Sequence, residues 1–221
     1  MRIEPRWLGR LSYKEGLSLQ ESLVQEKIEG SLTDHLLLLE HEPVYTMGRT
    51  RDESSLRMEI TLPYPVHRTN RGGQATYHGP GQLVGYPVLD LGLFNRDLHA
   101  YLRFLEEVLI TLLSRRSIPA GRLEGKTGVW VSDRKIASLG VGVRRWVSMH
   151  GFAINICGDL SAFSHITPCG LPGVMMTSLE AEGAIGVTVE SCAREVAEIF
   201  NELLQKGEFR AKAQRRGGDQ E

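Results

Sequence analysis

Residues 128–156 constrain the fold most, because short apolar runs follow one another there with almost no break. The runs match strands at residues 129–131, 136–143, 146–147 and 152–156. Three glycines, Gly140, Gly142 and Gly151, fall within or beside these runs. A glycine inside a strand often marks close approach by a ligand or by another backbone. The middle of the chain therefore predicts strands that something approaches closely.

Helices are expected on both sides of this region. Apolar residues recur every three or four positions across residues 97–114, which predicts an amphipathic helix. Two more helices are expected at residues 17–29 and at residues 188–206, the second with Thr188 as its N-cap. Earlier strands are expected at residues 36–39, 66–69 and 82–89, and Pro87 predicts an edge or a bulge for the last of these. The alternation predicts an α/β (α+β) fold, a single domain with a mixed sheet.

Composition limits the function classes. A chain of 221 residues can bury a real core, and we expect a catalytic domain over residues 1–207 with a polar, disordered tail over residues 208–221. A formal net charge of −1 argues against a bulk nucleic-acid binder, whose phosphate contacts need a basic surface. The N-terminus lacks the apolar core of a signal peptide, and the longest apolar run, Leu36 to Leu39, cannot span a membrane. We therefore expect a cytoplasmic protein with neither nucleic-acid nor membrane partners.

The cysteines point to chemistry rather than to cross-links. There are three of them, without a C-x-x-C pair, so neither a disulfide framework nor a metal site is expected. Cys192 lies on the apolar stripe of the last helix and is expected in the core, whereas Cys157 ends a strand and is ambiguous. Cys169 stands between Pro168 and Gly170 in a non-periodic loop, which can present a thiol at a cleft as a nucleophile.

A lysine and several histidines compete for the role of partner to that cysteine. If strand alternation starts at Lys135, its side chain shares a face with Ala137 and the apolar residues at every second position after it, which would desolvate the ammonium. The histidines considered as bases are His78, His150 and His165. Residues 71–81 contain four glycines and can bring the backbone close to a ligand. The residues by themselves leave the choice between lysine and histidine open.

Long strings of the chain resemble one enzyme family. RGGQATYHGPGQLVGYPVLDL, GKTGVWV, RKIASLGVGVRRWVSMHGFAINI and ITPCGL closely resemble the octanoyltransferases, also called lipoyl(octanoyl) transferases or lipoate-protein ligase B, over about residues 33–180. The resemblance implies a fold like the catalytic domain of biotin and lipoate protein ligases. It implies transfer of an octanoyl group from acyl carrier protein to a lysine of lipoyl domains in 2-oxoacid dehydrogenases and glycine cleavage H protein. No cofactor is implied.

The same resemblance implies roles for individual residues. Cys169 would carry the acyl thioester, and Lys135 would be its catalytic partner. The implied substrate-binding residues are Arg71, Gly72, Gly73, Gln74, Ala75, Thr76, Tyr77, His78, Ser138, Leu139, Gly140, Gly151, Phe152 and Ala153. Because both protein partners of the family are acidic, a basic rim is expected from Arg49, Arg51, Arg68, Arg71, Arg144 and Arg145.

Two other functions are weighed against this one. The first is an ATP-dependent lipoate or biotin ligase on the same fold, which would need a nucleotide but no cysteine at position 169. The second is a non-catalytic protein that binds carrier or lipoyl domains, which would fail to acylate with any donor.

Overall fold

One mixed sheet organises the part of the chain described by the computed structural model, residues 3–50, 54–56, 61–167 and 173–207. Its spatial order is β1 (Glu4–Leu11), β2 (His35–His41), β6 (Gln82–Val88), β10 (Val147–Asn155), β9 (Arg134–Arg144), β8 (Lys126–Val131) and β7 (Ala120–Leu123). β1 runs parallel to β2, and every other neighbouring pair is antiparallel. The predicted fold class, α/β with a mixed sheet, is confirmed.

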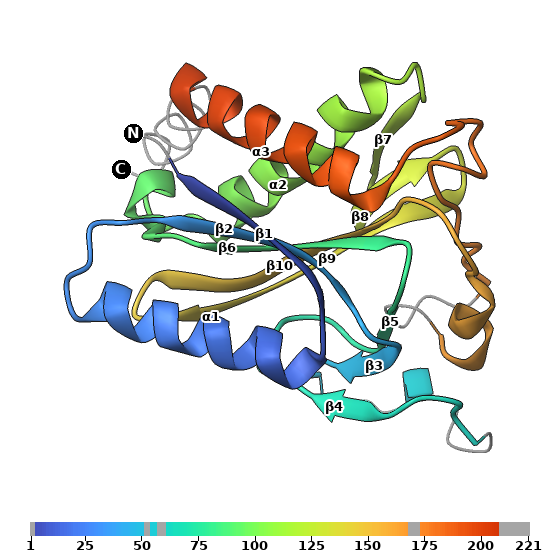
Figure 1. Cartoon of the computed structure of the whole chain (residues 1–221), viewed down its shortest axis with the longest axis horizontal. Helices are drawn as coiled ribbons and strands as arrows, with labels where there is room; N and C mark the ends of the chain where they lie inside the picture. Colours follow the sequence, from blue (N-terminus) through green and yellow to red (C-terminus); the bar gives the residue numbers. More distant parts are fainter. Residues whose placement is uncertain (1–2, 51–53, 57–60, 168–172, 208–221) are drawn as a thin grey trace.

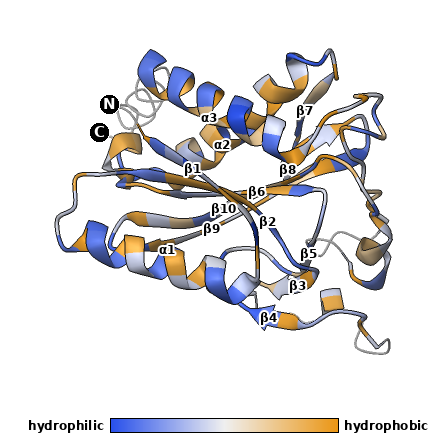
Figure 2. Cartoon of the chain, in the orientation of Figure 1, coloured by the Kyte–Doolittle hydropathy of each residue, from blue (hydrophilic) through white to orange (hydrophobic). Residues whose placement is uncertain are grey.

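Helices cover both faces of this sheet (Figure 1). α2 (Leu98–Ser114) and α3 (Val189–Lys206) pack on one face in the main core, where the rings of Phe104 and Phe200 meet edge to face with centroids 4.8 Å apart. α1 (Tyr13–Ile28) covers part of the other face. Figure 2 shows apolar residues concentrated along the central strands, between helices of mixed character. None of the described helices combines the length and apolarity needed to cross a membrane.

The helix ends follow from local capping chemistry. Asp97 caps α2 by accepting from the backbone N–H groups of His99 and Ala100. Thr188 caps α3 as predicted, and that helix ends at Lys206, with Gly207 as its C-cap at a φ of +65°. α1 begins at Tyr13 rather than near residue 17, because Ser12 and Glu15 form a capping box before the apolar pattern starts.

Pro87 corrects one prediction. It lies in β6, which is paired on both sides within the sheet, so of the two predicted alternatives, an edge or a bulge, the edge is wrong. Proline can stand there because the ladder between β6 and β10 stops at Gly85 and Phe152. Beyond this point the Ser148 hydroxyl donates to the Pro87 carbonyl oxygen at 2.8 Å. The ladder therefore requires no hydrogen bond from the backbone nitrogen of residue 87 to β10, and a proline, which has no N–H, can stand at this position.

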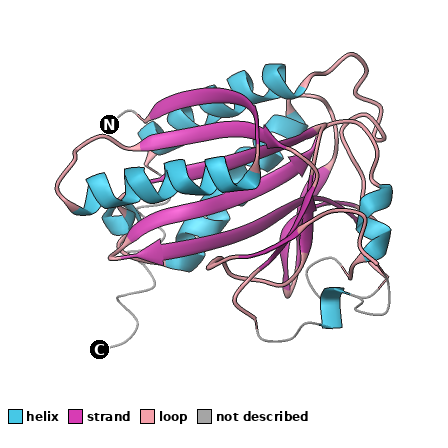
Figure 3. Ribbon diagram, turned by 60° about the horizontal axis from the view of Figure 1, so that its bottom comes forward, coloured by secondary structure: helices cyan, strands magenta, loops and turns pink. Residues whose placement is uncertain are grey.

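A smaller sheet stands at one end of the large one, next to the first turn of α1. It is formed by β4 (Val66–Arg68), β3 (Val44–Met47) and β5 (Thr76–His78). Figure 3 shows the α1 side of the large sheet, with this end of the molecule beside it. The three-residue strand β5 falls inside the glycine-rich segment, residues 71–81, for which no strand was predicted. The small sheet thus fixes that segment against the large one. Within the described residues, short 3₁₀ helices lie at Ser54–Leu56 (η1), Leu91–Phe94 (η2) and Ser161–His165 (η3).

Candidate active site

A cavity of about 340 Å³ lies between the glycine-rich segment and strands β9 and β10. Many of the residues predicted to bind substrate line it, namely Arg71, Gly72, Gly73, Thr76, His78, Ser138, Leu139, Gly140, Gly151, Phe152 and Ala153. Gln74, Ala75 and Tyr77 belong to the same segment but are outside the lining. The fold thus gathers three distant stretches of sequence around one space, while their role in substrate binding stays a prediction.

The cavity lining combines exposed, buried polar and apolar residues. The exposed ones are Gly73, Gly125, Lys126 and Thr127. Tyr13, Thr76, His78, Tyr86 and His150 are buried. Leu102, Leu139, Phe152 and Ala153 add apolar surface, which is the kind of lining that an alkyl chain can pack against.

Sequence reasoning missed part of this lining. Tyr13 arrives from the first residue of α1, Tyr86 from β6 and Leu102 from α2. Each of them looks like an ordinary core residue of an amphipathic helix or a strand. Nothing in the local pattern signals that the fold directs them toward a common cavity.

Glycines within β9 and β10 allow close backbone approach at two places. A Cβ on Gly140 in β9 would lie 3.0 Å from the carbonyl oxygen of Gly72, so this glycine lets the glycine-rich segment come close. A Cβ on Gly151 in β10 would lie 2.3 Å from the carbonyl oxygen of Gly85, so this glycine lets the neighbouring strand β6 come close. The pairs between β8 and β9 end at Val129 and Ala137. Past that point the N–H of Gly72 donates to the Val141 carbonyl oxygen at 2.9 Å. The predicted close approach at these glycines is confirmed, and the approaching group is backbone.

Arg71 braces the segment from inside. It is 8 % exposed, and its Nη2 donates to the carbonyl oxygen and to the hydroxyl oxygen of Thr46 at 2.7 and 2.8 Å. Its Nη1 donates to the Gly72 carbonyl oxygen at 2.9 Å. A guanidinium can serve several acceptors at fixed angles, so one side chain links the small sheet to the cavity wall.

The hydrogen bonds of His78 define its protonation. Gln82 uses its amide nitrogen to donate to Asn155 Oδ1 at 2.9 Å, so Gln82 Oε1 must accept, and His78 Nδ1–H donates to it at 2.7 Å. His78 Nε2 is then the acceptor for the Thr46 hydroxyl at 3.2 Å. Burial lowers the pKa of His78 to about 3, and the nearby His41 adds to the effect. His78 is therefore neutral at pH 7, with both ring nitrogens engaged, and is a poor candidate for the base.

His150 occupies a strained position in the wall. Its φ is +56°, which is uncommon for a residue other than glycine, and its backbone N–H donates to Gln20 Oε1 at 2.7 Å. Its Nε2 lies 2.5 Å from Asn70 Oδ1. Burial lowers the pKa of His150 to about 4, and the charges of Arg71 and Arg49 act in the same direction. The third histidine considered, His165, lies at the end of η3 and is not part of the cavity lining.

Lys135 is among the largest fully buried side chains, with 1 % of its surface exposed. Its backbone N–H donates to the Met175 carbonyl oxygen at 2.8 Å, and its own carbonyl oxygen accepts from Thr177 N–H at 3.0 Å. It forms an isolated parallel bridge with Met176. The segment that follows position 169 in sequence therefore lies beside Lys135. Cys169 itself lies outside the described residues.

The alternation expected from Lys135 onward is wrong. The pairing of β8 with β9 shifts register between Val129 and Trp130, so Val129 faces Ala137 while Trp130 faces Lys135. Successive residues of β8 point to opposite faces, and cross-strand partners share a face. Lys135 is therefore on the Trp130 face of the sheet, and not on the face of Ala137. Its Nζ lies 5.4 Å from the centroid of the Trp130 ring.

The two described cysteines are poor nucleophiles. Cys192 is fully buried in the main core, as expected, and burial raises its pKa to about 11. Cys157 is partly buried, and its pKa is also raised, first by burial and then by Glu180 and Glu40. A thiol reacts as its thiolate, so the raised pKa values disfavour both residues as nucleophiles near neutral pH.

Comparisons with known proteins agree with this geometry. The family described as "Lipoyl protein ligase A/B catalytic domain" matches residues 12–201. An octanoyltransferase of Geotalea uraniireducens is 53% identical over 199 residues, covering 90% of this chain and 92% of the relative. One from Syntrophotalea carbinolica is 49% identical over 203 residues, covering 92% and 95%.

Solved structures agree on the fold. Lipoate-protein ligase A bound with ATP superposes with a TM-score of 0.74 at 18% identity, covering 93% of this chain and 86% of that one. Biotin protein ligase from Aquifex aeolicus superposes with a TM-score of 0.53 at 15% identity, covering 93% and 71%. At such identities the likeness establishes the fold alone. The sequence relatives, which are far closer and match along most of their length, establish that this chain belongs to the octanoyltransferase family.

Proposed function

We propose that the protein transfers an octanoyl group from acyl carrier protein to a lysine of lipoyl domains through a thioester on Cys169. Octanoyl transfer follows from membership of the octanoyltransferase family. The donor, the covalent intermediate and the acceptors, 2-oxoacid dehydrogenases and glycine cleavage H protein, are the proposed part. The observation that carries the proposal is Lys135, a buried lysine hydrogen-bonded through its backbone to the segment that follows Cys169.

The first step would exchange one thioester for another. The Cys169 thiolate attacks the octanoyl carbonyl carbon, a new C–S bond forms, and the carrier leaves as its thiol after taking up a proton. Donor and intermediate are both thioesters, so this step needs no nucleotide. Lys135 as an ammonium would favour the attacking thiolate.

The second step would form an amide. The ε-amine of the acceptor lysine attacks the thioester carbon, a C–N bond forms, and the bond to Cys169 Sγ breaks. The attacking nitrogen must lose a proton, which Lys135 as a neutral amine could accept. An amide is more stable than a thioester, which drives the overall reaction forward. One lysine would thus alternate between two protonation states during a cycle.

The apolar part of the cavity lining supports an alkyl chain as the transferred group. Leu102, Leu139, Phe152 and Ala153 offer apolar surface, and burying one methylene contributes about 0.8 kcal/mol. Rates should therefore depend on acyl length.

A cytoplasmic location, where thiols stay reduced, suits a cysteine intermediate, and we propose it for this protein.

Intact-mass measurement tests the proposal. Octanoyl carrier protein alone, without ATP or magnesium, should add one octanoyl mass that hydroxylamine removes, and a lipoyl domain should then take up that mass. Cys169→Ala should abolish the adduct, whereas Cys157→Ala, a thiol with a raised pKa, should not. An adduct that persists in Cys169→Ala would exclude the assigned nucleophile.

Nucleotide dependence separates the main alternative. The fold is shared with a lipoate-protein ligase solved with ATP, so an ATP-dependent ligase is the second candidate. It would acylate a lipoyl domain from a free fatty acid and ATP, and Cys169→Ala would leave that reaction intact. A protein that acylates with neither donor would be a binding protein only.

A further inference from the structure

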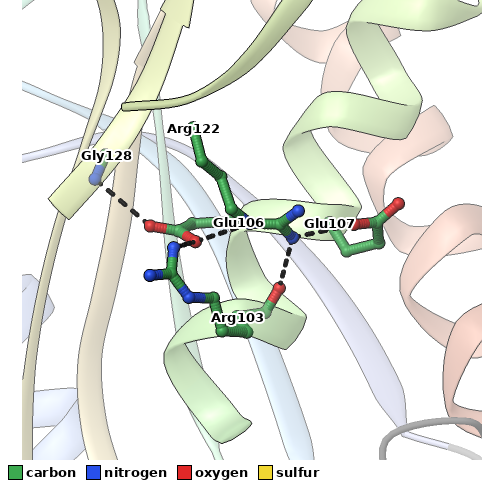
Figure 4. A network of polar contacts seen from close by, with 5 residues as sticks. All are labelled: Arg103, Glu106, Glu107, Arg122 and Gly128. Carbon is green, nitrogen blue, oxygen red and sulfur yellow. Dashed lines mark hydrogen bonds and ion pairs between the residues drawn. The ribbon is translucent and has the colours of Figure 1, made fainter. Parts of the chain in front are cut away.

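Helix α2 carries a buried carboxylate that faces the β7–β8 hairpin. Glu106 is 1 % exposed, and both of its oxygens are hydrogen-bonded (Figure 4). Oε2 accepts from Arg103 Nη1 at 2.7 Å and from Arg122 Nε at 2.8 Å, while Oε1 accepts from the backbone N–H of Gly128 at 3.3 Å. Burying a charge is costly unless it is paired and hydrogen-bonded, and these three bonds meet that condition.

Gly128, whose N–H is bonded to Glu106, is also in contact with the side chain of Lys135. A Cβ on Gly128 would stand 2.7 Å from Lys135 Cε and 3.3 Å from Lys135 Nζ, and 2.7 Å from the Ala137 carbonyl oxygen. The φ of Gly128 is +133°, a conformation that side chains disfavour. The Lys135 side chain therefore passes directly over the Gly128 backbone, beside the ring of Trp130. Any movement of Gly128 is transmitted to the ammonium.

We propose that Glu106 is a positioning residue for Lys135. By accepting the Gly128 N–H it fixes the backbone that supports the lysine stem, and by pairing with Arg122 it ties the neighbouring strand β7 to the same helix. The proposal rests on the proposed function, in which Lys135 acts at the reacting thioester. It adds a residue that never touches substrate but determines where the amine stands.

Glu107 provides a matched control. Its Oε2 accepts from Arg122 Nη2 at 2.7 Å, so it shares the arginine with Glu106. Its side chain is 38% exposed, however, and the contacts drawn in Figure 4 do not link it to Gly128. In Glu106→Gln only one oxygen remains for two sets of donors. The arginines attract that oxygen more strongly than a neutral N–H does, so Gly128 loses its acceptor. Glu107→Gln removes charge from Arg122 and leaves Gly128 held.

Lysine labelling tests the positioning without using activity. The folded protein is treated with an amine-acetylating reagent, and modification at each lysine is quantified by peptide mass spectrometry. Glu106→Gln should raise labelling of Lys135 by about tenfold, and Glu107→Gln should not change it. Lys27, paired with Asp34 at 2.9 Å near the end of α1, reports on general loosening. Equal increases at Lys27 and Lys135, or no increase at Lys135, overturn the proposal.

Kinetics link the positioning to the reaction. Transfer from preformed acyl-enzyme to a lipoyl domain should slow about tenfold in Glu106→Gln with KM for the domain unchanged, and its pH profile should shift. Gly128→Ala displaces the lysine directly and should reproduce both results, which keeps the test open if Glu106→Gln does not fold.

Absence of acyl-enzyme in the wild type would reject the proposed function, while the labelling result would still decide the positioning. Identical kinetics in Glu106→Gln and Glu107→Gln reject the positioning alone.

Discussion

Lys135 lies beside the ring of Trp130, with Nζ 5.4 Å from the ring centroid, because β8 and β9 shift register next to this pair. A cation at this distance from an indole gains roughly 0.5–2 kcal/mol, depending on how dry the site is. Gly128 supports the same side chain. The side chain is thereby confined between Gly128 and Trp130, and its backbone is bonded to the segment that follows position 169. Lys135 itself is not part of the cavity lining.

Substitutions of Lys135 should separate the two half-reactions. Lys135→Ala should slow both by about 100-fold or more and raise the pH at which iodoacetamide alkylates Cys169 at half its maximal rate. Lys135→Arg keeps the charge and should restore much of the first step. It should not restore transfer to the lipoyl domain, because arginine does not give up its proton. Stopped-flow alkylation and single-turnover transfer measure the two effects.

If Lys135→Arg transfers at the wild-type rate, the lysine acts through its charge only. If Lys135→Ala leaves both steps unchanged, the assigned pair is wrong, and His150 becomes the better candidate, since both ring nitrogens of His78 are already engaged.

Gly140 should control the fit of the acyl chain. A Cβ there would lie 3.0 Å from the Gly72 carbonyl oxygen and 3.2 Å from Arg71 Cδ, so the segment over the cavity must move by a few tenths of an ångström. Gly140→Ala should raise KM for octanoyl carrier protein several-fold, with a stability loss of about 1 kcal/mol. Gly121→Ala in β7 is the control, because a Cβ there meets nothing within 4 Å. Equal KM values in the two variants would contradict the prediction.

The regular elements were predictable because their signals are local. The apolar period of α2, the Thr188 cap and the apolar run in β2 depend on residues that are neighbours in sequence. The short strands were not predictable in this way. Thr76–His78 becomes a strand only because it pairs with Val44–Met47, some thirty residues away. Glu4–Leu11, which mixes polar and apolar residues without a clear period, pairs with β2.

The features of the site also fall into those that local sequence predicts and those that depend on distant residues. Glycines inside the strands β9 and β10 predict that another group approaches closely, and the structure confirms this prediction. The face of Lys135 could not be read from alternation, because one register shift reverses it. Likewise, Glu106 looks like any polar residue of an amphipathic helix. Its burial depends on Arg103 and Arg122, and only the packed hairpin places Arg122 there.

Acid should destabilise the fold through its buried histidines. Burial lowers the pKa of His41 to about 4, of His78 to about 3 and of His150 to about 4. These values lie below the unfolded value of about 6.5, so between them the unfolded chain binds protons that the folded chain does not. Stability should therefore fall as pH drops from about 6.5 toward 4, by about 3 kcal/mol for His41 alone.

Urea denaturation at a series of pH values measures this slope. His41→Gln removes one titrating group. The slope of the unfolding free energy against pH should therefore decrease by the contribution of about one proton. His99→Gln, an exposed position on α2, is the matched control. A stability that stays constant between pH 6.5 and 4.5 would show that the histidines are not held neutral by the fold.

Salt should weaken the reaction with protein substrates. Arg49 and Arg68 are exposed beside the glycine-rich segment, and Arg49 N–H donates to the Arg71 carbonyl oxygen at 2.9 Å. Arg144 is exposed at the end of β9, two residues beyond Gly142, whose Cβ would lie 3.4 Å from the Asn70 carbonyl oxygen. Of the expected basic rim, Arg51 lies outside the described residues. Arg71 is buried and cannot belong to the rim, so the prediction is wrong for that residue. The exposed members, Arg49, Arg68, Arg144 and Arg145, are predicted to form a positive margin beside the cavity.

Such a margin would steer acidic partners, and the attraction is screened over about 10 Å at 0.1 M salt. We expect kcat/KM for octanoyl carrier protein to fall about tenfold from 20 to 200 mM salt, while a small octanoyl thioester shows no such fall. Arg144→Glu should lower the low-salt value and flatten the salt dependence. Arg194→Glu reverses an equally exposed charge on α3, which covers the opposite face of the sheet, and should match the wild type. If the two variants behave alike, only total charge matters, and the margin beside the cavity has no part in recognition.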